Sequence, residues 1–485
     1  MTMTNRSRWI ALYVLCLGDI MIVLDGTIVN VALPSIRDDL GFSQTSLAWI
    51  VNAYLLTFGG FLLLGGRLGD LFGHRRLFLI GIALFTAASL GCGLANSQGL
   101  LIAGRAVQGV GGAIVSAVAL SLLMLLFTET SDRAKAMGVF GFVLSGGGVI
   151  GVLAGGILTD LLSWHWIFLV NLPVGVAVFV LSLRLLPAEH GPAATGKVDY
   201  AGAITVTSAL MLAVYAIVNG NDEGWTSVQT LGMLGAAAAL IAVFLVIESR
   251  VASPLVPLGL FRNRNVSTSN VVGVLMAAGM FSYFFFSALY LQLVLQYSPM
   301  EVGLAYLPGT VIWGASSLFL SQRLVMRYGI KPPLLTGLAL MTLALVLLAR
   351  TPVDGNWAID ILPATIALGI GAGIAFNPIL LAAMSGVAPE QAGLASGVVN
   401  TSFMMGGAVG LAILASLAAS RSDNQLASGV ESLVALNSGY HLAFLVGAVF
   451  LVAAGSVGAA LLSVETPQEH GGEAAHGALA AAEAD

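Results

Sequence analysis

Residues 17–34 of this 485-residue chain have the sequence LGDIMIVLDGTIVNVALP, an apolar stretch that contains two carboxylates, Asp19 and Asp25. The stretch overlaps an apolar run at residues 9–31, which is long enough for a helix to cross about 30 Å of hydrocarbon. An ionisable side chain at that depth is costly to insert, so it usually marks a proton, ion or substrate pathway. These residues therefore predict a membrane-spanning helix with a functional carboxylate inside it.

The composition of the whole chain is typical of a membrane protein. It is 58% hydrophobic and 9% charged, with a mean hydropathy of +0.95, whereas soluble domains carry about 25% charged residues. A backbone in lipid must satisfy its own hydrogen bonds, so long apolar runs are expected to be helices. We expect an all-α polytopic membrane protein with about 14 transmembrane helices, at residues 9–31, 45–66, 77–96, 99–127, 135–159, 164–186, 198–219, 228–248, 266–292, 302–325, 332–350, 358–385, 392–419 and 440–463.

The Lys and Arg residues predict how the chain lies in the membrane. If the N-terminus is cytoplasmic and the spans alternate, most bases fall in cytoplasmic loops, and only Arg37, Arg350 and Arg421 fall outside. This distribution obeys the positive-inside rule and places both termini in the cytoplasm. The excess of Arg over Lys and the abundance of Ala are typical of a GC-rich bacterial genome. We expect a bacterial cytoplasmic membrane protein and, without a basic tract, no nucleic-acid partner.

The second half of the sequence repeats the first. Arg67 corresponds to Arg323, and Gly147 and Gly151 correspond to Gly406 and Gly410, at a nearly constant offset. Chance similarity between glycine-rich helices is the alternative explanation. The repeat predicts two bundles of about six helices each. Their expected bounds are residues 1–190 and 258–463, with two inserted helices at residues 191–257 and a disordered cytoplasmic tail at residues 464–485.

Residues 66–76, with the sequence GRLGDLFGHRR, resemble the cytoplasmic loop signature of the major facilitator superfamily. Leu71 replaces the base that usually follows the Asp. The resemblance implies a charge-paired cytoplasmic gate, and Leu71 implies a weaker one; a plain positive-inside loop is the alternative. The gate would comprise Gly66, Arg67, Asp70, Gly73, Arg75 and Arg76.

Three further segments resemble motifs of one branch of that family, the drug:proton antiporters with fourteen helices. They are LDGTIVNVALP at residues 24–34, RAVQGVGG at residues 105–112 and WHWIFLVNLPVG at residues 164–175. The resemblance implies a secondary transporter that exports lipophilic small molecules, such as drugs, antibiotics or related metabolites, in exchange for protons. It implies alternating access, a role for Arg105 in proton coupling, and no cofactor beyond the proton gradient.

Gly147, Gly151 and Gly155 recur every four residues, which lets helix backbones approach closely. With Gly156 they lie in a segment that resembles the antiporter motif of the fifth helix, although Val152 stands where the motif has Pro. A packing face and a specific antiport role remain equally open. Val152 also keeps open a uniporter or symporter of a metabolite or lipid.

Asp25 and Arg105 lie at similar depths, about 13 Å and 9 Å from the same end of their helices. Gln108 shares a helix face with Arg105. The depths predict that the two charges meet, either as a proton-coupling pair or as a static structural ion pair. Asp19 is the competing site: it could titrate, contact a cationic substrate, or stay protonated and hydrogen-bonded. The expected proton-coupling residues are Asp25, Arg105 and Asp19.

The second half lacks these charges, since Phe281 corresponds to Asp25 and Thr365 to Arg105. Its late helices lack the extra acids of family relatives that export divalent cations, so the resemblance implies neutral, zwitterionic or singly charged lipophilic substrates. Its aromatic and amide side chains suit an apolar pocket with few polar anchors. Each of them could instead pack in the core or face lipid. The expected cavity residues are Asn30, Gln108, Phe281, Tyr283, Gln292, Trp313, Phe376, Asn377 and Asn400, with no metal ligand among them.

An enzyme or a sensor is the third hypothesis. The chain has no phosphate-binding Gly-Lys-Ser/Thr loop and no pair of catalytic side chains typical of an intramembrane protease. We therefore expect a transporter and not an enzyme. Its partners would be lipophilic small molecules, protons and membrane lipids, and we expect a monomer. The two inserted helices carry no charge in their interiors, which favours a peripheral position outside the pathway.

Overall fold

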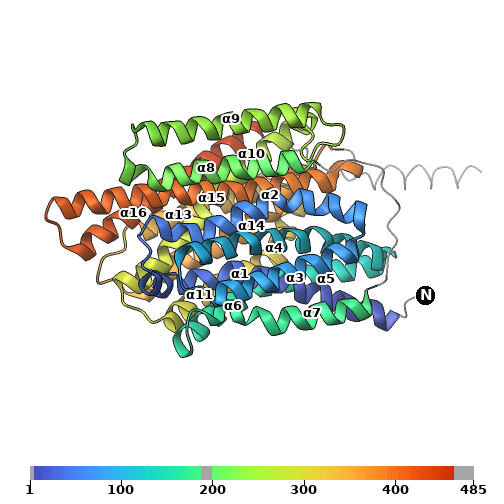
Figure 1. The fold of residues 1–485 in the computed structure, drawn as a ribbon, viewed down its shortest axis with the longest axis horizontal. Coiled ribbons are helices and arrows are strands. Elements are labelled where there is room, and N and C mark those ends of the chain that lie inside the picture. The colour runs from blue at the N-terminus through green and yellow to red at the C-terminus, as the bar shows by residue number, and fades with distance from the viewer. Residues whose placement is uncertain (1–4, 128, 187–198, 388, 464–485) are drawn as a thin grey trace, which may run out of the picture.

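The computed structural model describes residues 5–127, 129–186, 199–387 and 389–463, and nearly all of these residues are helical. Thirteen helical segments are long and apolar enough to cross a membrane, and they run side by side along the molecule (Figure 1). A further apolar helical segment, Gly147–Leu161 in α5, is shorter than these thirteen. The predicted all-α polytopic fold is confirmed. The tail predicted at residues 464–485 lies outside the described residues.

The helices fall into three consecutive groups along the chain. The first contains α1 (Asn5–Leu40), η1 (Ser46–Ala48), α2 (Trp49–Phe72), α3 (His74–Gly93), α4 (Gln98–Leu126), α5 (Thr130–Leu161), α6 (Trp166–Leu169) and α7 (Asn171–Leu185). The second contains α8 (Tyr200–Glu223) and α9 (Val228–Arg250). The third contains η2 (Leu258–Arg262), α10 (Arg264–Leu289), η3 (Tyr290–Val294), α11 (Pro299–Ala315), η4 (Ser316–Ser321), α12 (Gln322–Tyr328), α13 (Lys331–Leu348), η5 (Trp357–Ile361), α14 (Leu362–Met384), α15 (Pro389–Ala427) and α16 (Ser432–Leu461).

Local sequence explains where several helices begin and end. Gly73 separates α2 from α3 with φ of 92°, a conformation that favours glycine. Ser298 begins α11 with a capping box, in which its hydroxyl accepts from the Glu301 N–H and the Glu301 carboxylate accepts from the Ser298 N–H. Gly73 thus ends α2 at the turn before α3, and Ser298 supplies a hydrogen-bond acceptor for a free N–H group at the start of α11.

The first helix is longer than its apolar run predicts. It continues through Pro34 to Leu40, whereas the run ends at residue 31. Pro removes one backbone hydrogen bond, and neighbouring helices in a membrane bundle make that loss tolerable. Asp25 therefore lies about 22 Å along the helix from its end, and not about 13 Å as expected from the sequence, where Pro34 was taken as the end.

Helix pairing in the first group recurs in the third. Helix α1 packs against α5 and α7, α2 against α4, and α3 against α4 and α7. In the same order, α10 packs against α15 and α16, α11 against α14, and α13 against α14 and α16. The two groups meet along two seams, in which α5 packs against α11 and α2 packs against α15.

Helices α8 and α9 cover only one of these seams. Helix α8 packs against both α2 and α15, and α9 lies outside α8 at the edge of the molecule (Figure 1). A Cβ on Gly60 of α2 would collide with the Thr207 side chain of α8. The Asn221 side-chain amide of α8 donates to the Ser416 carbonyl of α15 at 2.7 Å. The inserted pair is thus attached to both groups.

Candidate functional site

A buried ion pair lies inside the first group of helices. The Arg105 guanidinium of α4 donates to the Asp25 carboxylate of α1, and these side chains are 1% and 0% exposed. A buried ion pair is stable only when further hydrogen bonds satisfy its remaining polar atoms. The helices around this pair supply them.

Two amides complete the shell around the Asp25 carboxylate. Gln108 donates to its Oδ1 at 2.7 Å, and Asn171 of α7 donates to the same oxygen at 3.1 Å. Both amides also donate to the Ser89 hydroxyl of α3, at 2.9 and 3.0 Å. Side chains of α4 and α7 therefore donate to one carboxylate of α1, and Ser89 of α3 holds both amides in place.

The Arg105 guanidinium has partners besides Asp25. Its Nε donates to the Ile50 carbonyl of α2 at 3.0 Å, and another nitrogen donates to the Gln108 side-chain carbonyl at 2.7 Å. Its central carbon also lies 4.3 Å from the centre of the Tyr54 ring, a cation–π contact. The guanidinium can therefore keep several contacts when Asp25 becomes neutral.

Sequence reasoning placed Asp25, Arg105 and Gln108 in this cluster but missed Asn171, Ser89 and Tyr54. Asn171 lies within the quoted segment at residues 164–175, so an amide in an otherwise apolar motif was an available signal. Ser89 and Tyr54 occupy unremarkable positions in apolar helices, where nothing in the sequence indicates a polar contact.

Asp19 has a different environment from Asp25. The Ser116 hydroxyl of α4 donates to its Oδ1 at 3.0 Å. The other oxygen, Oδ2, is buried and has no hydrogen-bond partner among the described residues. The Asp19 side chain thus has one polar contact where Asp25 has three donor residues, and it lies about 9 Å away along α1.

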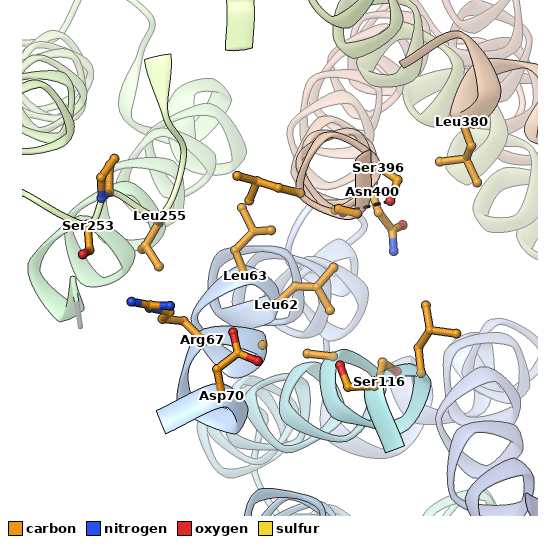
Figure 2. A pocket seen from close by; sticks show the side chains of 18 of the residues that line it. Leu62, Leu63, Arg67, Asp70, Ser116, Ser253, Leu255, Leu380, Ser396 and Asn400 are labelled. Carbon is orange, nitrogen blue, oxygen red and sulfur yellow. Dashed lines mark hydrogen bonds between the residues drawn. The ribbon is translucent and has the colours of Figure 1, made fainter. Parts of the chain in front are cut away.

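A cavity of about 760 Å³ lies between the two groups of helices. Its walls come from α2, α4, α14, α15 and the segment between α9 and η2, and Figure 2 shows their side chains around it. Arg67 and Asp70 of α2, Ser116 of α4, and Phe376 and Asn400 of α14 and α15 all line it. Since Ser116 also donates to Asp19, one hydroxyl separates that carboxylate from the cavity.

The predicted gate residues do not act as one cluster in this structure. Gly66, Arg67 and Asp70 line the cavity, and Gly73 forms the turn after α2. Asp70 of α2 pairs with His74, the first residue of α3, at 3.3 Å. Arg75 points elsewhere and donates to the Leu183 carbonyl of α7 at 2.6 Å, and Arg76 is exposed.

The four predicted packing glycines face two helices. A Cβ on Gly147, Gly151 or Gly155 would press against α1, first at Ile20, Thr27 and Ile28 respectively. A Cβ on Gly156 would instead lie 2.5 Å from the Pro299 carbonyl oxygen of α11. The glycines of α5 thus allow close approach both within the first group and across the seam.

Of the nine predicted cavity residues, Phe376 and Asn400 line the cavity. Tyr283 and Trp313 lie in an aromatic cluster with Phe284 and Tyr306, around a separate space of only about 10 Å³. This cluster is almost filled by its own rings, so it is a packed region and not part of the large cavity.

The other five predicted cavity residues do not line the cavity, because their side chains have partners elsewhere. Asn30 donates to carbonyls of its own helix, and Gln108 belongs to the Asp25 cluster. Phe281 packs against the Phe403 ring, with centres 6.0 Å apart. Gln292 donates to the Val31 carbonyl at 2.8 Å and so joins α1 to η3, and Asn377 donates to Ser317. In the described ranges, no three His, Cys, Asp or Glu side chains come together.

Comparison with known proteins identifies the family. Residues 15–411 match the model of the Major Facilitator Superfamily. The chain is 37% identical to the puromycin resistance protein pur8 of Streptomyces alboniger, over 92% of this chain and 90% of that protein. It is 36% identical to the cephamycin export protein CmcT of Amycolatopsis lactamdurans, over 91% and 90%.

Solved structures show the same fold. A peptide transporter of the POT family superposes with a TM-score of 0.67 at 16% identity, over 96% of this chain and 99% of that one. The nucleoside transporter NupG superposes with a TM-score of 0.66 at 13% identity, over 93% and 100%. The chain therefore belongs to the major facilitator superfamily, and it is a membrane transporter and not an enzyme.

Proposed function

We propose that this transporter exports lipophilic small molecules, antibiotics among them, in exchange for protons. The observation that carries the proton coupling is the buried Asp25–Arg105 pair, which links helices α1 and α4 within the first group of helices. The named roles of the two curated relatives, puromycin resistance and cephamycin export, support the substrate class. Transport of the substrate and transport of the proton would depend on the same relative movement of two units, helices α1–α7 and helices α10–α16.

The repeated helix pairing supports a division into residues 1–190 and 258–463, with residues 191–257 inserted between them. Two such units, with a substrate path between them, are the basis of alternating access. The cavity lies at the end of the bundle that carries Arg67 and Asp70. The positive-inside rule places this end in the cytoplasm, together with both termini, in a bacterial plasma membrane. The structure would then represent an inward-facing state.

Contacts between the units support closure at the other end. The Gln292 side chain donates to the Val31 carbonyl, which lies beyond Asp25 on α1. Gly156 allows α5 to approach Pro299 at the start of α11. Both contacts would have to break for the cavity to open on the outer side.

The proton step follows from the partners of the ion pair. A proton that binds the Asp25 carboxylate removes the charge that holds the Arg105 guanidinium, which keeps its contacts with Ile50, Gln108 and Tyr54. The amides of Gln108 and Asn171 would then hold a neutral carboxyl less tightly, because hydrogen bonds to charged groups are the stronger ones. Loss of these bonds frees α1 from α4 and α7, and release of the proton restores them.

Asp19 would serve the cavity side of this step. Its carboxylate is one hydroxyl, that of Ser116, away from the cavity. We assign it an accessory role in proton entry or in contact with a cationic substrate, and we assign the coupling itself to Asp25 and Arg105. The expected monomer contains every residue that this scheme needs.

Export in cells tests the proposal. The chain is expressed in a host stripped of its own pumps, and sensitivity to puromycin, cephamycin and other lipophilic compounds is measured. We expect lower accumulation of at least one compound, and a protonophore should abolish the difference. Export that persists when the proton gradient is collapsed would contradict antiport and support a uniporter. No change in sensitivity to any compound would contradict drug export.

A further inference from the structure

We propose that the segment at residues 251–257, which follows the inserted helices α8 and α9, forms a substrate-contacting wall of the cavity and helps to select what is transported. The inference rests on the proposed export function. It places the segment that follows the inserted pair in the pathway, whereas α8 and α9 themselves do not line the cavity.

The first observation is that the segment faces the cavity. Ser253, Pro254 and Leu255 line it together with Arg67 of α2 and Asn400 of α15. Figure 2 shows Ser253 and Leu255 on this wall of the cavity. The segment presents a hydroxyl group, a proline ring and an aliphatic side chain. An apolar surface with a single polar group suits a lipophilic molecule that carries few hydrogen-bonding groups.

The second observation is that the segment is held in place. Leu255 packs in a buried cluster with Leu64 of α2 and Ala203 of α8. The Val256 N–H donates to the Glu248 carboxylate of α9 at 3.2 Å, and Glu248 is 3% exposed. These contacts give Ser253 and Pro254 defined positions, which a wall that distinguishes substrates requires.

The third observation is that the segment reaches both units. Val256 packs against the cluster of Leu64 and Leu255 on the α2 side. It also packs against a second buried cluster, of Leu260, Val266 and Val398, which belongs to η2, α10 and α15. A change in the distance between α2 and α15 would therefore move this wall as well as the two helices. The size of the cavity and the position of the 251–257 segment are therefore coupled.

Cysteine labelling tests the inference, because the two native cysteines, Cys16 and Cys92, are both buried. Ser253→Cys is compared with Ser249→Cys, which lies one turn earlier on an exposed part of α9 and outside the cavity. Both variants are reconstituted and treated with a membrane-impermeant maleimide, with and without puromycin or ethidium. We expect either compound, at ten times its dissociation constant, to slow labelling of Cys at position 253 about tenfold. Labelling at position 249 should not change.

A bulky side chain supplies the second arm. Ser253→Trp would occupy part of the cavity, and we expect the KM for export to rise about tenfold, more for larger substrates. Ser249→Trp, the matched control, should export at the wild-type rate. Cys at position 253 that reacts no faster than the native chain would overturn the inference. So would labelling that is not slowed by a compound which the wild type is shown to export, or equal transport of that compound by the two Trp variants. If export does not depend on the proton gradient but the compound still slows labelling at position 253, the coupling proposal is contradicted and this inference is supported.

Discussion

Helices α1–α7 and α10–α16 pair in the same pattern. At corresponding positions, however, the first set has charged side chains and the second set has uncharged ones. Asp25 and Arg105 form an ion pair in the first set. In the second set, Phe281 packs against the Phe403 ring, and the Thr365 hydroxyl donates to the Leu362 carbonyl of its own helix. One unit therefore has a buried site that can change charge, and the other has none at the equivalent place.

The difference shows what the repeat preserves. Gly151 allows α5 to approach Leu24 of α1, and Gly410 allows α15 to approach Ala278 of α10 at the corresponding position. The glycines allow the same close approach of helices in both units. The other side chains between these helices can therefore differ in charge and polarity. The charged unit needs partners from several helices, whereas the aromatic unit needs only complementary packing.

The largest expected effect is on the ion pair itself. Arg105→Met removes the countercharge and leaves the Asp25 carboxylate buried, which should cost about 3–5 kcal/mol of stability. Thermal unfolding of the purified protein measures it. Thr365→Val at the corresponding position should change the midpoint little. Adding Asp25→Asn to Arg105→Met should recover part of the loss, and a double variant no more stable than the single one would show that the charge is not the cause.

A smaller effect is expected where both units use glycine. A Cβ on Gly151 would lie 3.0 Å from the Leu24 carbonyl oxygen, and one on Gly410 would lie 2.7 Å from the Ala278 Cα. Gly151→Val and Gly410→Val should each destabilise the protein by about 1–3 kcal/mol through overpacking. Gly148→Ala, whose Cβ would meet nothing within 4 Å, is the control. Similar losses in both units would support a shared scaffold, and a loss in one unit alone would argue against it.

The aromatic cluster around Trp313 should affect stability without affecting proton coupling. The Trp313 ring stacks on Phe284 with centres 6.2 Å apart. Trp313→Ala should cost about 0.5–1.5 kcal/mol from this ring pair, in addition to its lost buried area. This cluster is packed and lies outside the large cavity, so we expect the KM for export and its dependence on the proton gradient to stay unchanged. Thermal unfolding of the purified variant measures the loss of stability. Trp313→Phe, which keeps a ring, should lie near the wild type. Loss of proton dependence in Trp313→Ala would contradict the claim that proton coupling resides in helices α1–α7 alone.

The smallest effect is expected at Asp19. Asp19→Asn keeps an acceptor for the Ser116 hydroxyl and removes a buried carboxyl whose second oxygen has no partner among the described residues. Stability should stay the same or rise slightly, because a poorly partnered carboxyl is costly to bury. The export rate should fall by less than the roughly 10²-fold that loss of a dedicated proton-transfer group costs. Complete loss of proton-coupled export would transfer the coupling role from Asp25 to Asp19, and Ser116→Ala would then be the variant to compare.

Sequence alone predicted the membrane fold and the central ion pair, because long apolar runs and intramembrane charges are strong physical signals. It could not predict which aromatic and amide side chains line the cavity. These helices are apolar on all sides, so no polar face shows which way Gln292 or Phe281 points. The 251–257 segment was missed for a related reason: short irregular segments carry no periodicity, and only the fold places Ser253 and Leu255 in the cavity.

Proton movement in Asp25→Asn tests the central claim most directly. The wild type and the variant are reconstituted in proteoliposomes with an imposed pH gradient, and substrate and proton fluxes are measured together. Asn keeps the size of the side chain and one acceptor oxygen, which can face either Arg105 or the amides of Gln108 and Asn171. It cannot bind and release a proton. We predict that the variant folds, binds substrate, and moves neither protons nor substrate against a gradient. A variant that transports at the wild-type rate and still moves protons would contradict the claim that Asp25 couples the two fluxes.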